Sequence, residues 1–95
     1  MGAHESPNCP VARRLKEARL GAGLSQRRLG IAAGIDPGTA STRINRYERG
    51  AHIPDYSTLT AIAHVLNVPV AWFYADRDDL ASWILAFDSS LSPRN

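Results

Sequence analysis

The sequence predicts an all-α protein, and three observations support that class. Apolar residues recur three and four positions apart through most of the 95-residue chain, which is the spacing of an amphipathic helix. Glycines, prolines and short capping side chains interrupt these stretches, and no stretch has the pattern of a strand. A hydrophobic content of 44% and a charged content of 21% are ordinary for one domain with a single small core.

The first two expected helices are bounded by residues that begin and end helices. The first spans about residues 10–22, because Pro10 suits a first turn and glycines follow at the far end. The second spans about Gln26–Ala33. Ser25 before it is a good N-cap, and Gly34 after it tolerates the left-handed conformation that closes many helices.

The third expected helix carries the side chains with the clearest chemistry. Asp36 and Pro37 combine a capping side chain with the imino acid favoured at the first helical position, so the helix begins at about Pro37 or Thr39 and ends at Tyr47. The polar positions between residues 39 and 49 are hydroxyls, an amide and guanidiniums. These groups reach base edges and phosphates, so the helix suits a DNA groove.

Two further helices and a final amphipathic stretch complete the chain. A fourth helix follows Asp55, a plausible N-cap, and extends to Leu66. A short fifth helix runs from Pro69 to about Tyr74. The last stretch has apolar residues at the spacing of one helix face, and these are Leu80, Trp83, Ile84, Phe87 and Leu91.

This last stretch has two interpretations. It can fold back over the small core, or it can bury its apolar strip against a second chain. A homodimer is favoured, because two domains can read two half-sites about one helical turn of DNA apart. The contacts expected with a second copy or another partner are Leu80, Trp83, Ile84 and Phe87.

Positive charge is concentrated in the first half of the chain. Residues 1–54 carry nine arginines and lysines against four acids, whereas residues 55–95 carry two arginines against five aspartates. Ten of the eleven cations are arginine, whose planar fork makes bidentate contacts with phosphate and guanine. This distribution is expected of a DNA-binding face, with an ordinary solvated basic surface as the alternative.

Short motifs follow one another in a defined order along residues 11–74, and together they resemble the Xre and phage-repressor class of helix-turn-helix proteins, which includes the Cro and lambda repressor families. The resemblance implies a five-helix lambda-repressor-like domain over residues 10–75, between a flexible tail at 1–9 and a C-terminal amphipathic helix and tail at 76–95. About four residues more than is usual in the family precede Glu48, and they lengthen either the turn or the front of the third helix. The matching residues are Leu15, Arg19, Leu24, Ser25, Gln26, Leu29, Ala33, Gly34, Ile44, Glu48, Arg49, Gly50, Pro54, Leu59, Ala63, Leu66 and Phe73.

The resemblance also implies roles for individual side chains. Ser41, Thr42 and Arg46 are the first candidates for base contacts, and Arg43 and Asn45 are the second. Arg46 can pair with the O6 and N7 atoms of guanine, and the hydroxyls can meet several bases or a thymine methyl. Phosphate contacts are expected from Ser25, Gln26, Arg27, Arg28, Arg49 and His52.

An ion pair between Arg19 and Glu48 is implied in the same way, and it would tie the first helix to the third; two unrelated surface charges are the alternative. The histidines and Cys9 lack metal-ligand spacing, and no set of nucleophile, base and acid is present, so no metal, cofactor or enzymatic activity is expected. The single cysteine and the lack of an apolar run approaching ~18 residues favour a cytoplasmic protein without a membrane span.

The sequence therefore predicts a sequence-specific transcriptional regulator. Its helix from about Thr39 to Tyr47 would enter the major groove of double-stranded DNA, while the second helix and the loop after Gly50 hold phosphates. An antitoxin-like or other protein-interaction module is the alternative, in which the C-terminal apolar helix binds a partner protein.

Overall fold

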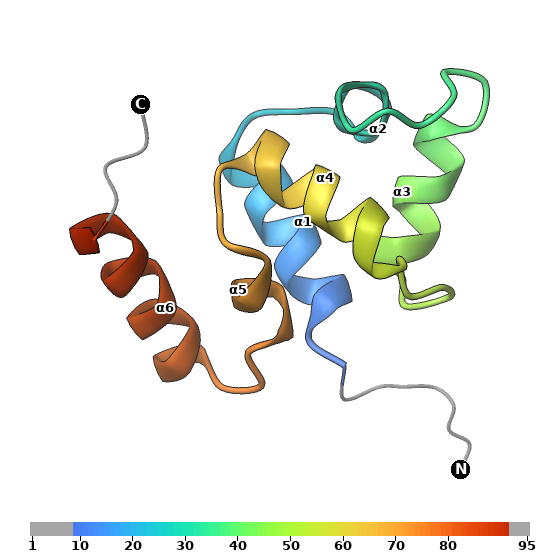
Figure 1. The fold of residues 1–95 in the computed structure, drawn as a ribbon. Coiled ribbons are helices and arrows are strands. Elements are labelled where there is room, and N and C mark those ends of the chain that lie inside the picture. Colours follow the sequence, from blue (N-terminus) through green and yellow to red (C-terminus); the bar gives the residue numbers. More distant parts are fainter. Residues whose placement is uncertain (1–8, 92–95) are drawn as a thin grey trace, which may run out of the picture.

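The computed structural model describes residues 9–91, and the side chains of residues 9–88, as an arrangement of α-helices without a strand in that range (Figure 1). This architecture confirms the predicted all-α class. Residues 1–8 of the expected tail and the side chain of Leu91 lie outside the described residues. The helices are α1 (Val11–Gly21), α2 (Gln26–Ala32), α3 (Ala40–Glu48), α4 (Tyr56–Leu66), α5 (Val70–Tyr74) and α6 (Asp78–Leu91).

Two helices begin at the side-chain caps that the sequence predicts. The Ser25 hydroxyl accepts a hydrogen bond of 3.0 Å from the backbone N–H of Arg28 at the start of α2. The Asp55 carboxylate accepts one of 2.8 Å from the backbone N–H of Thr58 at the start of α4. Each cap satisfies a donor that the first helical turn leaves unpaired, so local sequence fixes both boundaries.

The third helix begins at Ala40 with Thr39 as its N-cap, so of the two predicted starts Thr39 is within one residue and Pro37 is wrong. The Asp36 carboxylate accepts a hydrogen bond of 2.9 Å from the N–H of Gly38, and the Asp36 carbonyl accepts one of 3.0 Å from the N–H of Thr39. Aspartate often closes a turn in this way instead of capping a helix. The additional residues before Glu48 therefore lengthen the turn and leave the helix short.

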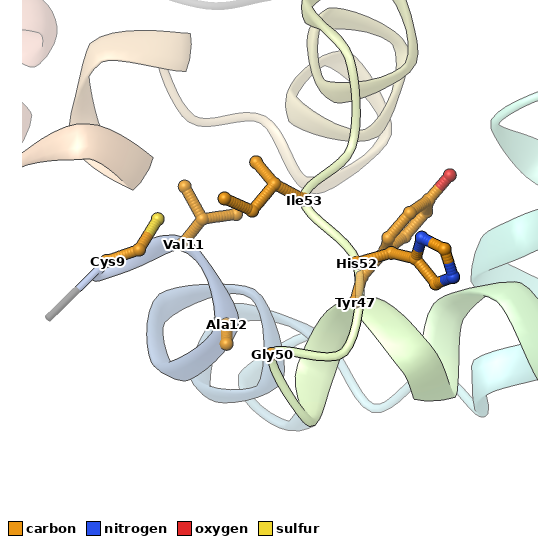
Figure 2. Close-up of a pocket in the computed structure, with 7 residues that line it drawn as sticks. All are labelled: Cys9, Val11, Ala12, Tyr47, Gly50, His52 and Ile53. Carbon is orange, nitrogen blue, oxygen red and sulfur yellow. The ribbon is translucent and has the colours of Figure 1, made fainter. Parts of the chain in front are cut away.

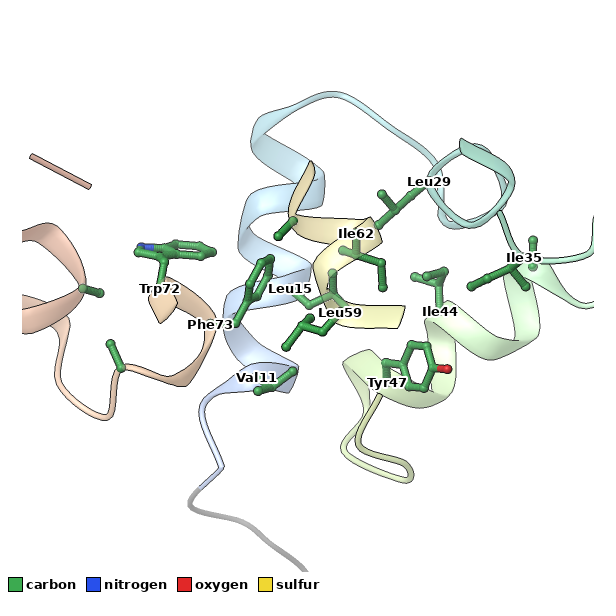
Figure 3. Close-up of a cluster of buried hydrophobic side chains, with 14 residues drawn as sticks. Val11, Leu15, Leu29, Ile35, Ile44, Tyr47, Leu59, Ile62, Trp72 and Phe73 are labelled. Carbon is green, nitrogen blue, oxygen red and sulfur yellow. The ribbon is translucent and has the colours of Figure 1, made fainter. Parts of the chain in front are cut away.

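The hydrophobic core lies between α1, α4 and the α2–α3 pair, and α5 covers one end (Figure 3). Leu15 from α1, Ile44 from α3 and Phe73 from α5 are fully buried. The rings of Trp72 and Phe73 meet edge to face at 5.2 Å between centroids, which suits the aromatic quadrupole. The same core therefore fixes both the orientation of α3 and the position of the chain that leads into α6.

Helices α2 and α3 approach each other closely at a glycine. A Cβ atom placed on Gly30 would lie 2.7 Å from the Cβ of Ala40 and 3.1 Å from its Cα. Ala40 is fully buried, so it has little room to move away. This contact seats the first residue of α3 directly against α2 and sets the geometry of the helix-turn-helix.

Helix α6 lies on the opposite side of the molecule from α3, with α1, α4 and α5 between them (Figure 1). It packs on α5 through the buried Ala81 and the partly buried Leu85. Trp83 and Phe87 on the same helix are 77% and 66% exposed. The helix therefore covers part of its own core with one side and leaves most of the Trp83 and Phe87 surface exposed.

Candidate nucleic-acid interface

The outer surface of α3 presents the polar side chains that the sequence singled out. Ala40, Ile44 and Tyr47 are buried and hold the helix against the core. The opposite side faces solvent, so the side chains on it can reach a ligand without any rearrangement of the core. Ser41, Thr42, Arg43 and Arg46 are exposed there, and Asn45 is half-buried.

Arg43 is held within the protein, unlike Arg46. Its Nη2 donates a hydrogen bond of 2.6 Å to the Tyr47 hydroxyl, and its guanidinium lies 5.8 Å from the centre of the Tyr47 ring. Such a cation over an aromatic face is a favourable contact. In the described part of the chain, no hydrogen bond or ion pair holds the Arg46 guanidinium. Arg43 must leave Tyr47 before its guanidinium can turn to a ligand, whereas Arg46 has no such contact to break among the described residues.

Arg46 and His52 share a surface hollow of about 340 Å³ beside the end of α3. Asp55 lies at its edge, and hydrogen bonds from Thr58 hold the pKa of that carboxyl below its ordinary value, with a smaller contribution from the charge of Arg43. The hollow brings two predicted base contacts, Arg43 and Arg46, together with one predicted phosphate contact, His52. Its lining residues are Arg43, Arg46, Tyr47, His52, Ile53 and Asp55.

A second, much smaller pocket shares Tyr47, His52 and Ile53 with this hollow and lies between the start of α1 and the loop that follows α3. Figure 2 shows Cys9 at one end of it, and Tyr47 and His52 at the other. Within residues 9–88, the histidine of this pocket therefore does not lie beside the thiol, where it could activate it as a nucleophile. Among the described residues, no group of three His, Cys, Asp or Glu could hold a metal ion, and no helix is long and apolar enough to cross a membrane.

The N-terminus of α2 presents a second polar surface next to α3. Arg27 and Arg28 are exposed, and Ser25 caps the helix. The side-chain amide of Gln26 donates a hydrogen bond of 3.1 Å to Glu48, which fixes its position. Free N–H groups and the helix dipole favour an anion at such an end.

The Arg19 and Glu48 side chains form the predicted ion pair. The Nε and Nη2 of Arg19 donate hydrogen bonds of 2.5 and 3.0 Å to the two carboxylate oxygens of Glu48, and Nη1 donates one of 2.9 Å to the Leu24 carbonyl. The two side chains are only 10% and 3% exposed. The bond to Glu48 raises the pKa of Arg19 above its ordinary value, although burial opposes this. The pair joins α1 to the end of α3.

Comparison with known proteins agrees with this arrangement. The family model described as helix-turn-helix matches residues 15–73, which is more than half of the chain. The chain belongs to the helix-turn-helix family. This membership confirms the resemblance to the Xre and lambda-repressor class and its all-α fold.

Relatives of known sequence or structure are also regulators by name. The crystal structure of the transcriptional regulator BswR is similar with a TM-score of 0.76 and 48% identity, over 86% of this chain and 80% of that one. Uncharacterized HTH-type transcriptional regulators of Sinorhizobium medicae and Rhizobium meliloti are each 36% identical over 66 residues, or 70% of this chain. The chain matches 45% of the length of these two curated relatives.

The sequence reasoning missed one buried residue of this helix-turn-helix protein. Arg14 is 2% exposed, and its Nε and Nη2 donate hydrogen bonds of 3.0 and 3.2 Å to the carbonyls of Ala75 and Arg77. Its guanidinium also lies 5.6 Å from the centre of the Trp72 ring. Its place three residues after Val11, on the apolar side of α1, was the available signal. Because Arg14 is charged, it was grouped with the other cations of residues 1–54, which were expected on a basic surface.

Proposed function

We propose that this protein is a sequence-specific DNA-binding transcriptional regulator that places α3 in the major groove. The observation that carries the proposal is the exposed polar side of α3, whose opposite side is fixed in the core by Ile44 and Tyr47. A helix that is rigid on one side and polar on the other can enter the major groove, which admits one helix. The names of the related regulators support the same function.

Base contacts are assigned to the side chains that are exposed or half-buried on α3. Arg46 is the principal one, because no hydrogen bond or ion pair among the described residues holds its guanidinium, and a guanidinium suits guanine. Ser41, Thr42 and Asn45 lie on the same helix, and Arg43 joins them if DNA displaces it from Tyr47. These contacts specify sequence, and phosphate contacts set the position of the protein on the duplex.

Phosphate contacts come from the two segments that flank α3 in the sequence. The end of α2 offers exposed arginines beside a capped N-terminus, and the loop after α3 offers an arginine and a histidine. A phosphate on each side of the groove would hold the helix between them. The residues assigned to this role are Ser25, Gln26, Arg27, Arg28, Arg49 and His52.

Binding experiments on two variants separate the two kinds of contact. Selection of bound duplexes from a random pool first defines a best site. Arg46→Ala should then weaken binding to that site by about 1–3 kcal/mol and relax the preference at one base pair. Arg27→Ala should weaken binding to all sequences alike and reduce the slope of log affinity against log salt by about 0.9. Affinity that does not change with salt contradicts the proposal.

The regulator is proposed to act in the cytoplasm as a homodimer, because one domain makes few base contacts and two domains can read a palindrome. A second function of a different class rests on the exposed aromatic side of α6. The protein would then be an antitoxin-like module that binds a partner protein through Trp83 and Phe87. A chain that binds DNA with no sequence preference but forms a stable complex with a foreign protein through α6 would favour that function.

A further inference from the structure

Helix α6 and the start of α5 form an apolar surface with a ridge and a hollow. Trp83 and Phe87 make the ridge, since they lie one helical turn apart and are 77% and 66% exposed. The hollow beside them has a volume of about 450 Å³, and Asp88 is the one charged residue among the described residues that line it. The α5–α6 face consists of Pro69, Ala71, Leu80, Trp83, Ile84 and Phe87.

We propose that the α5–α6 face is a self-association surface. Two copies meet there about a two-fold axis, and Trp83 of each copy enters the hollow of the other. The contact deepens the homodimer proposed above by naming its surface and its anchor residue. It does not require DNA, so it can be tested on the protein alone.

The shape of the face favours a second copy. In a two-fold contact the same patch serves both partners, so the patch must carry a protrusion and the cavity that receives it. The α5–α6 face has both, because the Trp83 ridge and the hollow lie side by side on one surface. A large aromatic side chain that fills a pocket near the centre of an interface often supplies much of its binding energy.

The chemistry of the face disfavours other occupants. Small-molecule sites combine an apolar pocket with several convergent polar groups, whereas this hollow has one carboxylate at its edge. Helix α6 contains three aspartates and no lysine or arginine. Helices that lie on membranes carry lysine and arginine on their polar side, and surfaces that bind nucleic acid use the same cations to contact phosphates. The occupant that fits this face is therefore the apolar surface of a protein.

Charge at the margin of the face does not oppose the contact between two copies. Asp78 is paired with Arg13 at 3.0 Å and with Arg14 at 3.2 Å, and Asp79 is paired with Arg77 at 3.0 Å. Each copy therefore neutralises the carboxylates at the start of its own α6. Two such faces can approach without placing unpaired acids from the start of α6 next to each other.

The small exposed area indicates weak association. Trp83 and Phe87 expose together roughly 300 Å² per copy, and the remaining residues of the face add to this. A standard interface buries about 800 Å² per partner, so this one is small. We therefore expect a dimer with a dissociation constant in about the micromolar range.

The position of the face is compatible with DNA binding. Helix α6 lies across the molecule from α3, so a contact through α6 leaves both copies of α3 uncovered (Figure 1). Arg14 holds the segment that leads into α6 through the carbonyls of Ala75 and Arg77. This anchoring gives the two DNA-reading surfaces a defined relative position.

Sedimentation of the full chain tests the proposal. From about 1 to 300 µM the native chain should shift from monomer to dimer. Its tryptophan emission should shift to shorter wavelength over the same range, because Trp72 is already buried and only Trp83 changes its environment. Trp83→Asp should be monomeric throughout, and Ser82→Asp, an equal charge at an exposed position of α6 outside the face, should dimerise within about twofold of the native chain.

Folding is checked separately. At the lowest concentration the two variants should melt within a few degrees of each other, because Trp83 is mostly exposed in one copy. A native chain that stays monomeric at about 300 µM overturns the proposal. A Trp83→Asp chain that still dimerises also overturns the proposal. A Ser82→Asp chain that loses dimerisation as fully as Trp83→Asp overturns it too.

A DNA experiment connects the contact with the proposed function. Native protein should bind a palindrome more tightly than Trp83→Asp does, with maxima when the half-sites are separated by whole helical turns, and both should bind a single half-site equally. If neither protein binds DNA, the regulator proposal fails while the sedimentation result still decides the interface. If the native chain dimerises and half-site spacing has no effect, the dimer contact stands and its role on DNA is contradicted.

Discussion

Two buried arginines on α1 hold the two ends of the molecule in different ways. Arg19 binds a carboxylate that is itself 3% exposed, and this pair fixes α3. Arg14 binds two backbone carbonyls and a carboxylate whose side chain is 78% exposed, and these contacts fix the start of α6. The first anchor depends mainly on one buried charge pair, with one further hydrogen bond to the Leu24 carbonyl. The second has no buried carboxylate, and its guanidinium binds two backbone carbonyls and a solvent-exposed carboxylate.

This difference predicts which substitutions destabilise each end of the protein. A buried charge without its partner is costly, so the α3 anchor should fail when either member is lost. The α6 anchor should tolerate loss of its carboxylate, because the backbone carbonyls remain to satisfy the guanidinium. The α3 side is thus held mainly by side chains, and the α6 side is held mainly by backbone.

The largest expected effect is on the α3 anchor. Arg19→Met or Glu48→Met should each lower the free energy of unfolding by about 3–5 kcal/mol, because each leaves one buried charge unpaired. The double substitution should recover part of the loss. Chemical denaturation of the native chain, the two single variants and the double variant measures these free energies of unfolding. If the loss in the double variant equals the sum of the two single losses, the two charges do not interact.

A smaller effect is expected where α2 meets α3. Gly30→Ala should lower the free energy of unfolding by about 1–3 kcal/mol, because the new methyl group overlaps the buried Ala40. Gly21→Ala is the matched control, since nothing lies within 4 Å of its new Cβ and helical backbone favours alanine. Thermal melts should show the two changes in opposite directions. Equal melting temperatures would mean that α2 and α3 separate at little cost.

Loss of the α6 anchor should be milder than loss of the α3 anchor. Arg14→Met should cost about 1–2 kcal/mol, because the buried carbonyl of Ala75 loses its donor while the apolar part of the side chain is retained. Amide exchange should quicken in α6 more than in α3. A uniform increase along the chain would show that Arg14 supports the whole fold and not the α6 side alone.

The smallest effect is expected at the exposed partner of Arg14. Hydrogen bonds from Arg13, and then Arg14, lower the pKa of Asp78 below its ordinary value. The stability that Asp78 contributes is therefore present above about pH 3.9 and is lost as pH falls through the lower folded value. Asp78→Asn should remove only this small acid-dependent part. If the melting temperature of Asp78→Asn at pH 7 fell as far as that of Glu48→Met, Asp78 would stabilise the fold as much as Glu48 does, which would contradict this expectation.

The sequence predicted most of the fold because its signals are local. Ser25 and Asp55 cap the helices that follow them, and both caps are observed. Asp36 gave a signal of the same kind that was wrong. Its carboxylate closes a turn with Gly38, and the helix starts only where Ala40 can pack on Gly30. A contact between two helices decided a boundary that the local residues left open.

The candidate site was predicted in part. The polar residues of α3 are exposed or half-buried as the pattern indicated, and the Arg19–Glu48 pair is present. Two contacts among them were not predicted. Arg43 and Tyr47 are four residues apart on α3, a spacing at which helical side chains meet, so the sequence carried a signal for that contact. Gln26 donates to Glu48, which is 22 residues away, and only the packing of α2 against α3 brings these two together. The assignment of each side chain to bases or phosphates stays a prediction.

The sequence by itself determined that the chain is all-α, that it carries a helix-turn-helix and that its cations gather in the first half. Helical periodicity, caps and charge are properties of neighbouring residues, and they need no partner to be visible. Tertiary structure decided which charges are buried and which apolar residues are not. Arg14 is buried because α5 and the start of α6 pack around it, and Trp83 is exposed because Ala81 and Leu85 take the side of α6 that meets the core.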